Sequence, residues 1–344
     1  MSQTGIRNDR PHVTARLPVA SCAPVALAPM AGITDLPFRE VVARFGAGMV
    51  VSEMVASKDM VNARPSARAK AELGFDSKIP TAVQLAGHDA YWMGEAARMV
   101  EAQGAQLIDI NMGCPAKKVV GGLSGSALMR KLDHALGLIE AVVMAVDIPV
   151  TLKTRLGWDH DTLNAPELAR RASEAGVQMV TIHGRTRCQF YKGQADWAAI
   201  GRVVEACPQP VLANGDITSV ARARSALALS GAAGVMVGRG AQGRPWLLAQ
   251  ITAEIFGGPP AAPPPTGSAL VDLVATHFEA ALAFYGRELG LKTMRKHLGW
   301  YCDAAGASRS ARHALLIAPT PAQVLSCLPD ALASSAVRAL EHAA

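Results

Sequence analysis

The stretch LIDINMGCP, residues 107–115, is an apolar run that ends in a turn. Its length and apolar character predict a buried strand, which Gly113 and Pro115 bring to an end. The thiol of Cys114 is therefore expected at the carboxyl end of this strand. The next segment, AKKVVGGLSGSAL (residues 116–128), contains two lysines and three glycines and predicts a mobile basic loop. The stretch thus combines a buried strand with a single thiol at its tip.

Similar short apolar runs recur along the chain, with amphipathic helical segments between them. Their nearly continuous apolar character is typical of parallel strands that are buried on both faces. Eight strand–helix units over about 230 residues predict a (β/α)8 TIM barrel. A doubly wound open sheet is the alternative, although such a sheet usually has fewer strands. The eight runs are PVALAPM (24–30), GMVVSEM (48–54), PTAVQLAG (80–87), LIDINMGCP (107–115), PVTLKTR (149–155), MVTIHGR (179–185), PVLANGD (210–216) and GVMVGRG (234–240).

The composition fits one large globular domain with a smaller second one. Of the 344 residues, 50% are hydrophobic and 18% are charged, which excludes an intrinsically disordered chain. After the barrel pattern comes a proline-rich segment, and the sequence that follows has helical patterns without a strand signal. We therefore predict an appended C-terminal all-helical domain. The predicted parts are a polar N-terminal extension (1–20), a TIM-barrel catalytic domain (21–256), a proline-rich linker (257–267) and a helical domain (268–344).

The cysteine pattern indicates a protein of the reducing cytoplasm. No CxxC pair is present, so neither a zinc ribbon nor a redox disulfide is predicted. The apolar segment 17–32 could imitate a signal peptide, but prolines interrupt it, and we expect a cytoplasmic protein. No apolar run is long enough to span a bilayer, and no ligand spacing indicates a metal, so we expect neither a membrane nor a metal ion as a partner. The six cysteines, all expected to be free, are Cys22, Cys114, Cys188, Cys207, Cys302 and Cys327.

The carboxyl ends of the predicted strands carry a series of polar residues. In a TIM barrel the active site lies at this end of the strands. One polar residue at one strand end could be a cap or a core hydrogen bond, but a succession of them indicates a common site. The residues at the eight strand ends are Pro29, Met30 and Ala31, Glu53, Gln84, Asn111 with Cys114, Lys153 with Arg155, His183 with Arg185, Asn214, Gly215 and Asp216, and Gly238 with Arg239.

The last two strand ends indicate a phosphate site. ANGDI (213–217) and VGRG (237–240) supply small residues and backbone N–H groups where barrels often bind phosphate. Arg239 adds a cation that can form a charge-assisted hydrogen bond. For each motif alone, an ordinary tight turn is the alternative. No GxGxxG motif lies between a strand and a helix, so a Rossmann dinucleotide fold is not predicted.

Seven longer motifs resemble the tRNA-dihydrouridine synthases, and their details are most similar to the DusB subgroup. Their order and spacing match over the whole barrel, from about residue 24, and one motif extends the resemblance into the C-terminal domain. The motifs are APMAGITDLPFR (28–39), INMGCPAKKVVGGLSGSAL (110–128), TLKTRLGW (151–158), TIHGRTR (181–187), ANGDI (213–217), VGRGAQGRPW (237–246) and MRKHLGWY (294–301).

The resemblance implies a flavoenzyme that reduces the C5–C6 double bond of selected uridines in tRNA. In this family FMN is bound in the barrel and NADPH supplies the reducing equivalents. The residues implied to line the isoalloxazine are Pro29, Met30, Ala31 and Gln84. Lys153 would lie near the N1–O2 edge of the flavin, where a cation stabilises the reduced anionic ring. The residues implied to hold the ribityl chain and the phosphate are His183, Asn214, Gly215, Asp216, Gly238 and Arg239.

The resemblance also implies a chemical role for Cys114. After a hydride reaches C6 of uracil, C5 needs a proton from the opposite side of the ring. A thiol with a pKa of about 8.5 is mostly protonated at pH 7 and can supply this proton. A buried structural thiol is the alternative for an isolated cysteine. The position at a strand end, within this motif, favours the proton donor.

Contacts with tRNA are expected from two basic regions. A uridine in folded tRNA must leave its stack to reach a barrel, and the protein must grip the RNA by shape and phosphates. The net charge of +6 fits a polyanionic partner, and Trp300 and Tyr301 follow a basic cluster in the C-terminal domain. A solvated helix face is the alternative for that cluster alone, and no obligate protein partner is expected. The predicted tRNA contacts are Asn111, Lys117, Lys118, Arg155, Arg185, Lys292, Arg295, Lys296 and His297.

Two other functions stay open on the sequence alone. A flavin barrel that acts on a free pyrimidine, such as a dihydroorotate-type dehydrogenase, would share the cofactor and the proton chemistry but would have no need of the helical domain. An RNA-binding or regulatory protein that has lost catalysis is the second alternative. The intact Cys114, Lys153 and His183 argue against that alternative.

Overall fold

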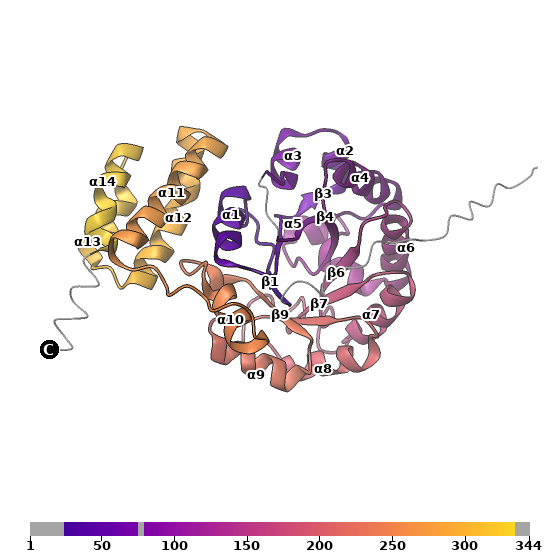
Figure 1. Ribbon diagram of the computed structural model, residues 1–344. Coiled ribbons are helices and arrows are strands. Elements are labelled where there is room, and N and C mark those ends of the chain that lie inside the picture. The colour runs from indigo at the N-terminus through magenta and orange to yellow at the C-terminus, as the bar shows by residue number, and fades with distance from the viewer. Residues whose placement is uncertain (1–23, 75–78, 334–344) are drawn as a thin grey trace, which may run out of the picture.

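The computed structural model describes residues 24–74 and 79–333. The predicted extension 1–20, Cys22 and the last eleven residues of the predicted helical domain (334–344) lie outside the described residues. The described chain forms a barrel of parallel strands surrounded by helices, with further helices beside it (Figure 1).

The strands close into a barrel. Every strand pairs in parallel with its neighbours, and β2 pairs with both β1 and β4, which leaves no open edge. The predicted TIM barrel is confirmed and the open-sheet alternative is wrong. The run predicted at 48–54 ends as β2 at Val51, and a short β3 continues the pairing with β4. The strands are β1 (Val25–Leu27), β2 (Met49–Val51), β3 (Val55–Ala56), β4 (Thr81–Ala86), β5 (Leu107–Met112), β6 (Val150–Arg155), β7 (Met179–His183), β8 (Val211–Asn214) and β9 (Gly234–Val237).

The helices between the strands cover the outside of the barrel (Figure 1). On α6, for example, Leu138, Ile139 and Val142 follow helical spacing and are fully buried against the strands. These elements are α1 (Leu36–Phe45), α2 (Ser57–Val61), α3 (Pro65–Ala71), α4 (Ala90–Ala102), α5 (Lys117–Gly121), η2 (Gly125–Arg130), α6 (Leu132–Val143), α7 (Ala165–Glu174), α8 (Trp197–Ala206), α9 (Val220–Ser230), η3 (Arg239–Ala241) and α10 (Leu247–Phe256).

The C-terminal helices form a second hydrophobic core. Val274, Phe278, Met294 and Leu298 are buried in it, and Trp246 reaches it from the segment before α10. No helix or strand lies between Phe256 and Gly267, and α11 begins at Gly267, one residue before the predicted start of the helical domain. The helices are α11 (Gly267–Tyr285), α12 (Arg287–Ala305), α13 (Arg309–Ile317) and α14 (Pro321–Leu332).

One helix among the described residues, α11, is long and apolar enough to cross a membrane by length and composition. In the structure it packs against α1, α12 and α14, and Leu270, Val274 and Phe278 point into the second core. Of the 18-residue apolar window in this helix, 28% is buried inside the protein.

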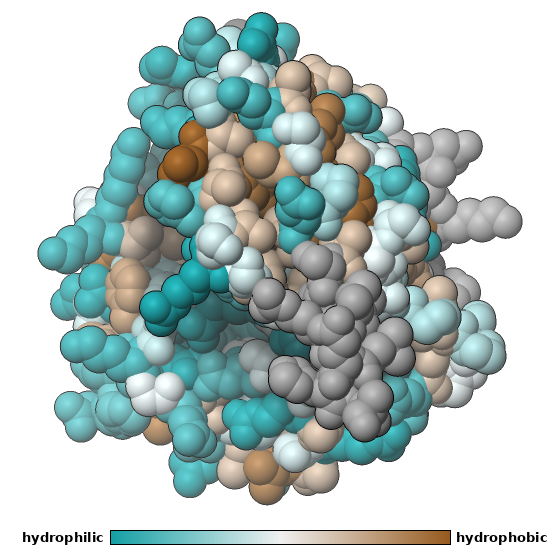
Figure 2. Space-filling view, turned by 90° about the vertical axis from the view of Figure 1, so that its left-hand side faces the viewer, coloured by the Kyte–Doolittle hydropathy of each residue, from teal (hydrophilic) through white to brown (hydrophobic). Residues whose placement is uncertain are grey.

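Helix α1 joins the barrel to the C-terminal helices, which stand beside it in Figure 1. Asp35 caps α1 by accepting a hydrogen bond from the Phe38 N–H at 3.0 Å. The Phe38 ring is fully buried and lies 5.7 Å from the ring of His277 and 5.1 Å from that of His297, measured between centroids. The face of the molecule on this side combines apolar patches with a hollow surrounded mainly by hydrophilic residues (Figure 2).

We expect Phe38→Ala to lower the free energy of unfolding by about 3–5 kcal/mol, because it removes a large ring from a packed junction. The control is Leu289→Ala, because that side chain is 52% exposed on α12. Urea denaturation of both variants measures the effect. Equal midpoints for Phe38→Ala and the wild type would contradict the packing role.

Candidate active site

A layer of hydrogen-bonded polar side chains crosses the barrel interior. Strand register makes Gln84, Asp109 and Thr151 neighbours on β4, β5 and β6. Gln84 Nε2 donates to Asp109 Oδ2 at 2.6 Å, and Thr151 Oγ1 donates to Asp109 Oδ1 at 2.6 Å. Burial raises the pKa of the Asp109 carboxyl, and the two hydrogen bonds oppose that rise. Our sequence interpretation missed Asp109, although its spacing of two from Asn111 places both on one face of β5.

Cys114 is held in place through its backbone. Asn111 Nδ2 donates to Gln84 Oε1 at 2.7 Å, and Asn111 Oδ1 accepts the Cys114 N–H at 3.0 Å. On the other side, the Cys114 carbonyl accepts from the Ser126 N–H at 3.1 Å and from Ser126 Oγ at 2.9 Å. Gly125 is required beside it, because it has φ +59° and a Cβ would lie 2.8 Å from the Cys114 carbonyl oxygen. The Cys114 backbone therefore has a defined position, and its side chain is half-buried.

The segment after Cys114 is more ordered than a mobile loop. It contains the short helix α5 and the 3₁₀ helix η2, and Ser126 ties η2 back to Cys114. Lys117 and Lys118 are exposed on α5, and none of its residues is buried. The contact of Ser126 with Cys114 carried no local signal in the sequence.

Lys153 projects from β6 toward β8. Its Nζ donates to Asn214 Oδ1 at 3.0 Å, and Asn214 Nδ2 donates to the Met236 carbonyl at 2.8 Å. Burial, assisted by the charge of Arg155, lowers the pKa of Lys153 to about 8. The ammonium form still predominates at pH 7, so Lys153 brings a positive charge to the strand ends.

Arg155 is buried and structural rather than exposed to an RNA. Its Nε donates to the Gly113 carbonyl at 2.8 Å, and its Nη1 donates to the carbonyls of Thr186 and Phe190, both at 2.9 Å. Burial lowers its pKa to about 10, so it stays charged at pH 7. Arg155 therefore joins the turn before Cys114 to the loop after β7. Its predicted contact with tRNA stays a prediction, and the structure shows the side chain bonded to backbone carbonyls of the protein.

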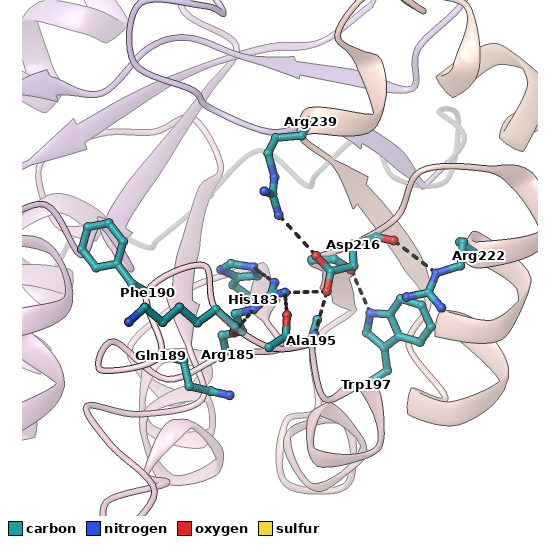
Figure 3. A network of polar contacts seen from close by, with 12 residues as sticks. His183, Arg185, Gln189, Phe190, Ala195, Trp197, Asp216, Arg222 and Arg239 are labelled. Atoms are coloured by element: carbon teal, nitrogen blue, oxygen red, sulfur yellow. Dashed lines mark hydrogen bonds and ion pairs between the residues drawn. The ribbon is translucent and has the colours of Figure 1, made fainter.

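Arg185 is a second buried guanidinium that was predicted to contact tRNA. Its Nη2 donates to Asp216 Oδ2 and to the Gly193 carbonyl, both at 2.6 Å, and its Nε donates to the Lys192 carbonyl at 3.1 Å (Figure 3). Only 2% of its side chain is exposed. Arg185 therefore fixes the loop after β7 against Asp216, and its predicted tRNA contact stays a prediction.

Asp216 is the centre of the network in Figure 3. Its Oδ2 also accepts the Ala195 N–H at 2.8 Å, and its Oδ1 pairs with Arg239 Nη2 at 3.3 Å. Burial alone would raise the pKa of this carboxyl, but the hydrogen bonds from Arg185 and Ala195 and the nearby guanidinium charges hold it below 3.8. Gly215 and Asp216 both have left-handed backbones, with φ of 113° and 55°. The ANGDI turn therefore has a specialised conformation instead of that of an ordinary tight turn.

His183 lies beside this turn as a neutral ring. Arg185 Nη1 lies 3.4 Å from His183 Nε2, and a guanidinium can only donate, so Nε2 is the acceptor and Nδ1 carries the proton. Burial and the charges of Lys153, Arg155, Arg185 and Arg239 lower the pKa of His183 well below 6.5. A Cβ on Gly215 would lie 2.7 Å from His183 Cδ2, which explains the glycine.

Arg239 and the loop after β1 complete the ring of strand ends. The Arg239 side chain is 57% exposed, so it can reach a ligand while it pairs with Asp216. Gly238 precedes η3, and a Cβ there would lie 3.7 Å from Met30 Sδ. The Met30 carbonyl accepts the Ile33 N–H at 2.9 Å, which curls the segment after Pro29 and Ala31. The first and last strands therefore meet at this end of the barrel.

The predicted tRNA cluster on α12 separates into different environments. Lys292 and Lys296 are both exposed, and Lys296 Nζ donates to the Gly32 carbonyl. Arg295 is half-buried, and its Nη2 donates to the Ala318 carbonyl at 3.2 Å. His297 is 1% exposed, and burial, with the nearby His277 and Lys296, lowers its pKa well below 6.5. Its prediction as a tRNA contact is wrong, because the neutral ring packs against α1. Tyr301 is buried as well and hydrogen bonds to His277 at 3.1 Å.

These strand ends combine positive charge with a thiol. Lys153 and Arg239 supply positive charge, Asp216 pairs with Arg185 and Arg239, and Cys114 lies close enough to Lys153 and Arg155 to interact with their charges. Among residues 24–74 and 79–333, no group of three or more histidine, cysteine or acidic side chains could hold a metal ion.

Comparison with known proteins identifies the family. The dihydrouridine synthase (Dus) family model matches residues 26–336. The chain is 63% identical over 310 residues to a probable tRNA-dihydrouridine synthase of Rhodobacter capsulatus, covering 90% of this chain and 94% of that one. It is 45% identical over 307 residues to the tRNA-dihydrouridine synthase B of Xanthomonas campestris, covering 89% and 92%. The chain belongs to the dihydrouridine synthase family of flavin-dependent oxidoreductases, as the motifs predicted, and it is similar to the DusB subgroup.

We expect Asp216→Asn to lower the free energy of unfolding by about 3–5 kcal/mol, because it leaves Arg185 buried without its carboxylate. Asparagine tolerates the left-handed backbone, so the charge is the main change. The control is Asp303→Asn, whose partner Arg312 is 40% exposed, and this variant should lose less than about 1 kcal/mol.

The same variant should have a defined pH dependence. The pKa of Asp216 is lowered in the folded state, so its contribution is complete above about pH 4 and is lost as the pH falls further. Urea denaturation at pH 7, 5 and 3 should therefore give a difference between the wild type and Asp216→Asn that narrows only at pH 3. A difference that disappears by pH 5 would argue against the ion pair.

Proposed function

We propose that this protein reduces the C5–C6 double bond of uridines in tRNA to give 5,6-dihydrouridine, with FMN as the bound flavin and NADPH as the reductant. The family and the names of its curated relatives support dihydrouridine formation in tRNA. The observation that carries the proposal is the position of Cys114, a backbone-anchored and partly exposed thiol beside cationic strand ends.

The residues at β8 and β9 fit the single phosphate of FMN. Arg239 is exposed and cationic, and the Gly215–Asp216 turn lets the backbone approach a ligand where a side chain at position 215 would collide with His183. His183, Asn214 and Gly238 lie at the same strand ends and would hold the ribityl chain and phosphate with them. A second nucleotide, as in FAD, has no corresponding fingerprint in the sequence.

Lys153 and Gln84 fit the ring portion of the flavin. Pro29, Met30 and Ala31 would form the wall on the β1 side. Lys153 would stabilise negative charge at the N1–O2 edge, because its ammonium lies in a buried site where an electrostatic interaction is stronger than in water. When bound there, FMN would be the source of the hydride that C6 of uracil gains.

Cys114 would complete the reduction by donating its thiol proton to C5 of uracil. Hydride at C6 and a proton at C5 together account for both hydrogens that the product gains. Asn111 and Ser126 would hold the donor in position through the Cys114 backbone.

The tRNA would approach along the basic side of the strand ends. Lys117 and Lys118 on α5 and Lys292 on α12 are exposed and free to meet phosphates, in contrast with the buried Arg155, Arg185 and His297.

The five cysteines of the described chain are all unpaired, which supports the cytoplasmic location that we propose. The test of the function is to measure dihydrouridine in tRNA nucleosides from a strain that lacks this protein and again after the protein is restored.

We expect Cys114→Ala to lower the rate of uridine reduction in tRNA by roughly 10²–10⁴-fold, which is the usual contribution of a positioned general acid. Oxidation of NADPH by the bound flavin should continue, because the thiol acts only on uracil. The control is Cys188→Ala, since Cys188 is exposed in the loop after β7. Single-turnover dihydrouridine formation measures the effect, and a wild-type rate for Cys114→Ala would exclude the proton-donor role.

Lys153→Met and Arg239→Ala should have different effects. Lys153→Met should retain much of the flavin but slow its reduction, whereas Arg239→Ala should mainly weaken FMN binding through lost phosphate contacts. In the wild type, flavin reduction should also slow as the pH rises above about 8, because Lys153 loses its charge there. Flavin fluorescence titrations and stopped-flow reduction measure both properties. Identical behaviour of the two variants would refute this division of roles.

A further inference from the structure

The loop between β1 and α1 has an internal framework. Met30 N–H donates to Thr34 Oγ1 at 2.8 Å, and the Thr34 N–H donates back to the Met30 carbonyl at 3.0 Å. This loop carries Pro29, Met30 and Ala31, which we propose as part of the flavin site. Its conformation therefore bears directly on how a flavin ring would be held.

The Gly32 peptide unit of this loop is held from two sides. Glu53, 4% exposed and located between β2 and β3, accepts the Gly32 N–H through Oε1. Lys296, in the middle of α12, donates through Nζ to the Gly32 carbonyl. Gly32 has φ +69°, and a Cβ would lie 3.2 Å from Lys296 Nζ. An anion from the barrel and a cation from the helical domain thus hold one peptide unit of the loop.

The helical domain also contacts the residues that follow Gly32, at Asp35 and at Phe38 near the start of α1. Tyr285, the last residue of α11, donates its hydroxyl to Asp35 Oδ2 at 2.9 Å, while Asp35 Oδ1 caps α1. The His297 ring packs on Phe38. The helical domain therefore binds the loop at Gly32, at Asp35 and at the start of α1, which makes the Lys296 contact part of a continuous junction.

We propose that Lys296 is a positioning residue for the flavin, which fixes the β1–α1 loop against the isoalloxazine, and that it is not a tRNA phosphate contact. This inference rests on the proposed FMN site. A charge-assisted hydrogen bond to a carbonyl holds a flexible turn more firmly than a neutral one does. A lysine that is committed to a backbone carbonyl is also less available for a phosphate. The helical domain thereby contributes to the flavin site as well as to RNA binding.

The experiment compares three full-length variants. Lys296→Met keeps the side-chain stem and removes the charge, Lys296→Arg restores a donor, and Arg287→Met removes a charge from the exposed first residue of the same helix. Hydrogen exchange of the 28–38 segment is measured without FMN, and FMN affinity is measured by flavin fluorescence. The salt dependence of tRNA affinity is the third measurement.

For Lys296→Met we expect exchange at residues 32–34 to be about tenfold faster and FMN affinity to be about tenfold weaker, which matches the loss of one hydrogen bond to a charged group. Lys296→Arg should recover most of the exchange protection and most of the FMN affinity. Arg287→Met should resemble the wild type in both measurements. The salt slope of tRNA binding should not change.

Two results would overturn the inference. One is wild-type FMN affinity for Lys296→Met, whatever the exchange measurement gives. The other is a tRNA salt slope that flattens by about one unit, as expected for a lost phosphate contact, with FMN affinity unchanged. If wild-type protein does not bind FMN at all, the proposed cofactor is wrong, and the exchange measurement in the apoprotein still decides whether Lys296 holds the loop.

Discussion

The pairing of β2 with β4 is the constraint on which the rest of the site depends. All the strands are parallel and therefore end on the same side, and this pairing closes them so that their ends form a ring. Residues far apart in the chain, such as Gln84, Cys114 and Asp216, are brought to one rim as a result. An open sheet with the same strands would spread them along an edge.

Polar side chains inside a closed barrel need hydrogen-bond partners from the protein itself. The buried Asp109 carboxyl group has partners there, because Gln84 and Thr151 each donate a hydrogen bond to one of its two oxygens. Arg155 and Arg185 have a different kind of partner, because most of their N–H groups donate to backbone carbonyls of the turns around the rim. Buried charge in this protein therefore organises the loops that a ligand would meet. Removing one partner of such a contact costs more than the contact itself contributes.

The helical domain has two distinct relations to the barrel. Its apolar residues, with Trp246 and Phe45, form a packed junction that keeps the two parts together. Its polar residues, among them Tyr285, reach individual groups of the loop after β1. The apolar junction stabilises the arrangement of the two parts. The polar contacts instead hold the loop after β1, which lies next to the proposed flavin, in a fixed position relative to the helical domain.

Sequence periodicity and motifs alone determined the barrel, its eight strand positions, the appended helices and the family, because buried parallel strands and family motifs are local patterns. They also assigned Cys114 to the end of β5 and Lys153 to β6, where the structure has them. Only the tertiary structure decided which basic residues face solvent. Arg155, Arg185 and His297 look like surface cations in the chain, yet their partners come from distant loops and helices. Likewise Asp109 and Ser126 acquire their roles from strand register and from a turn packed on Cys114, and burial of that kind depends on contacts that no short stretch of sequence contains.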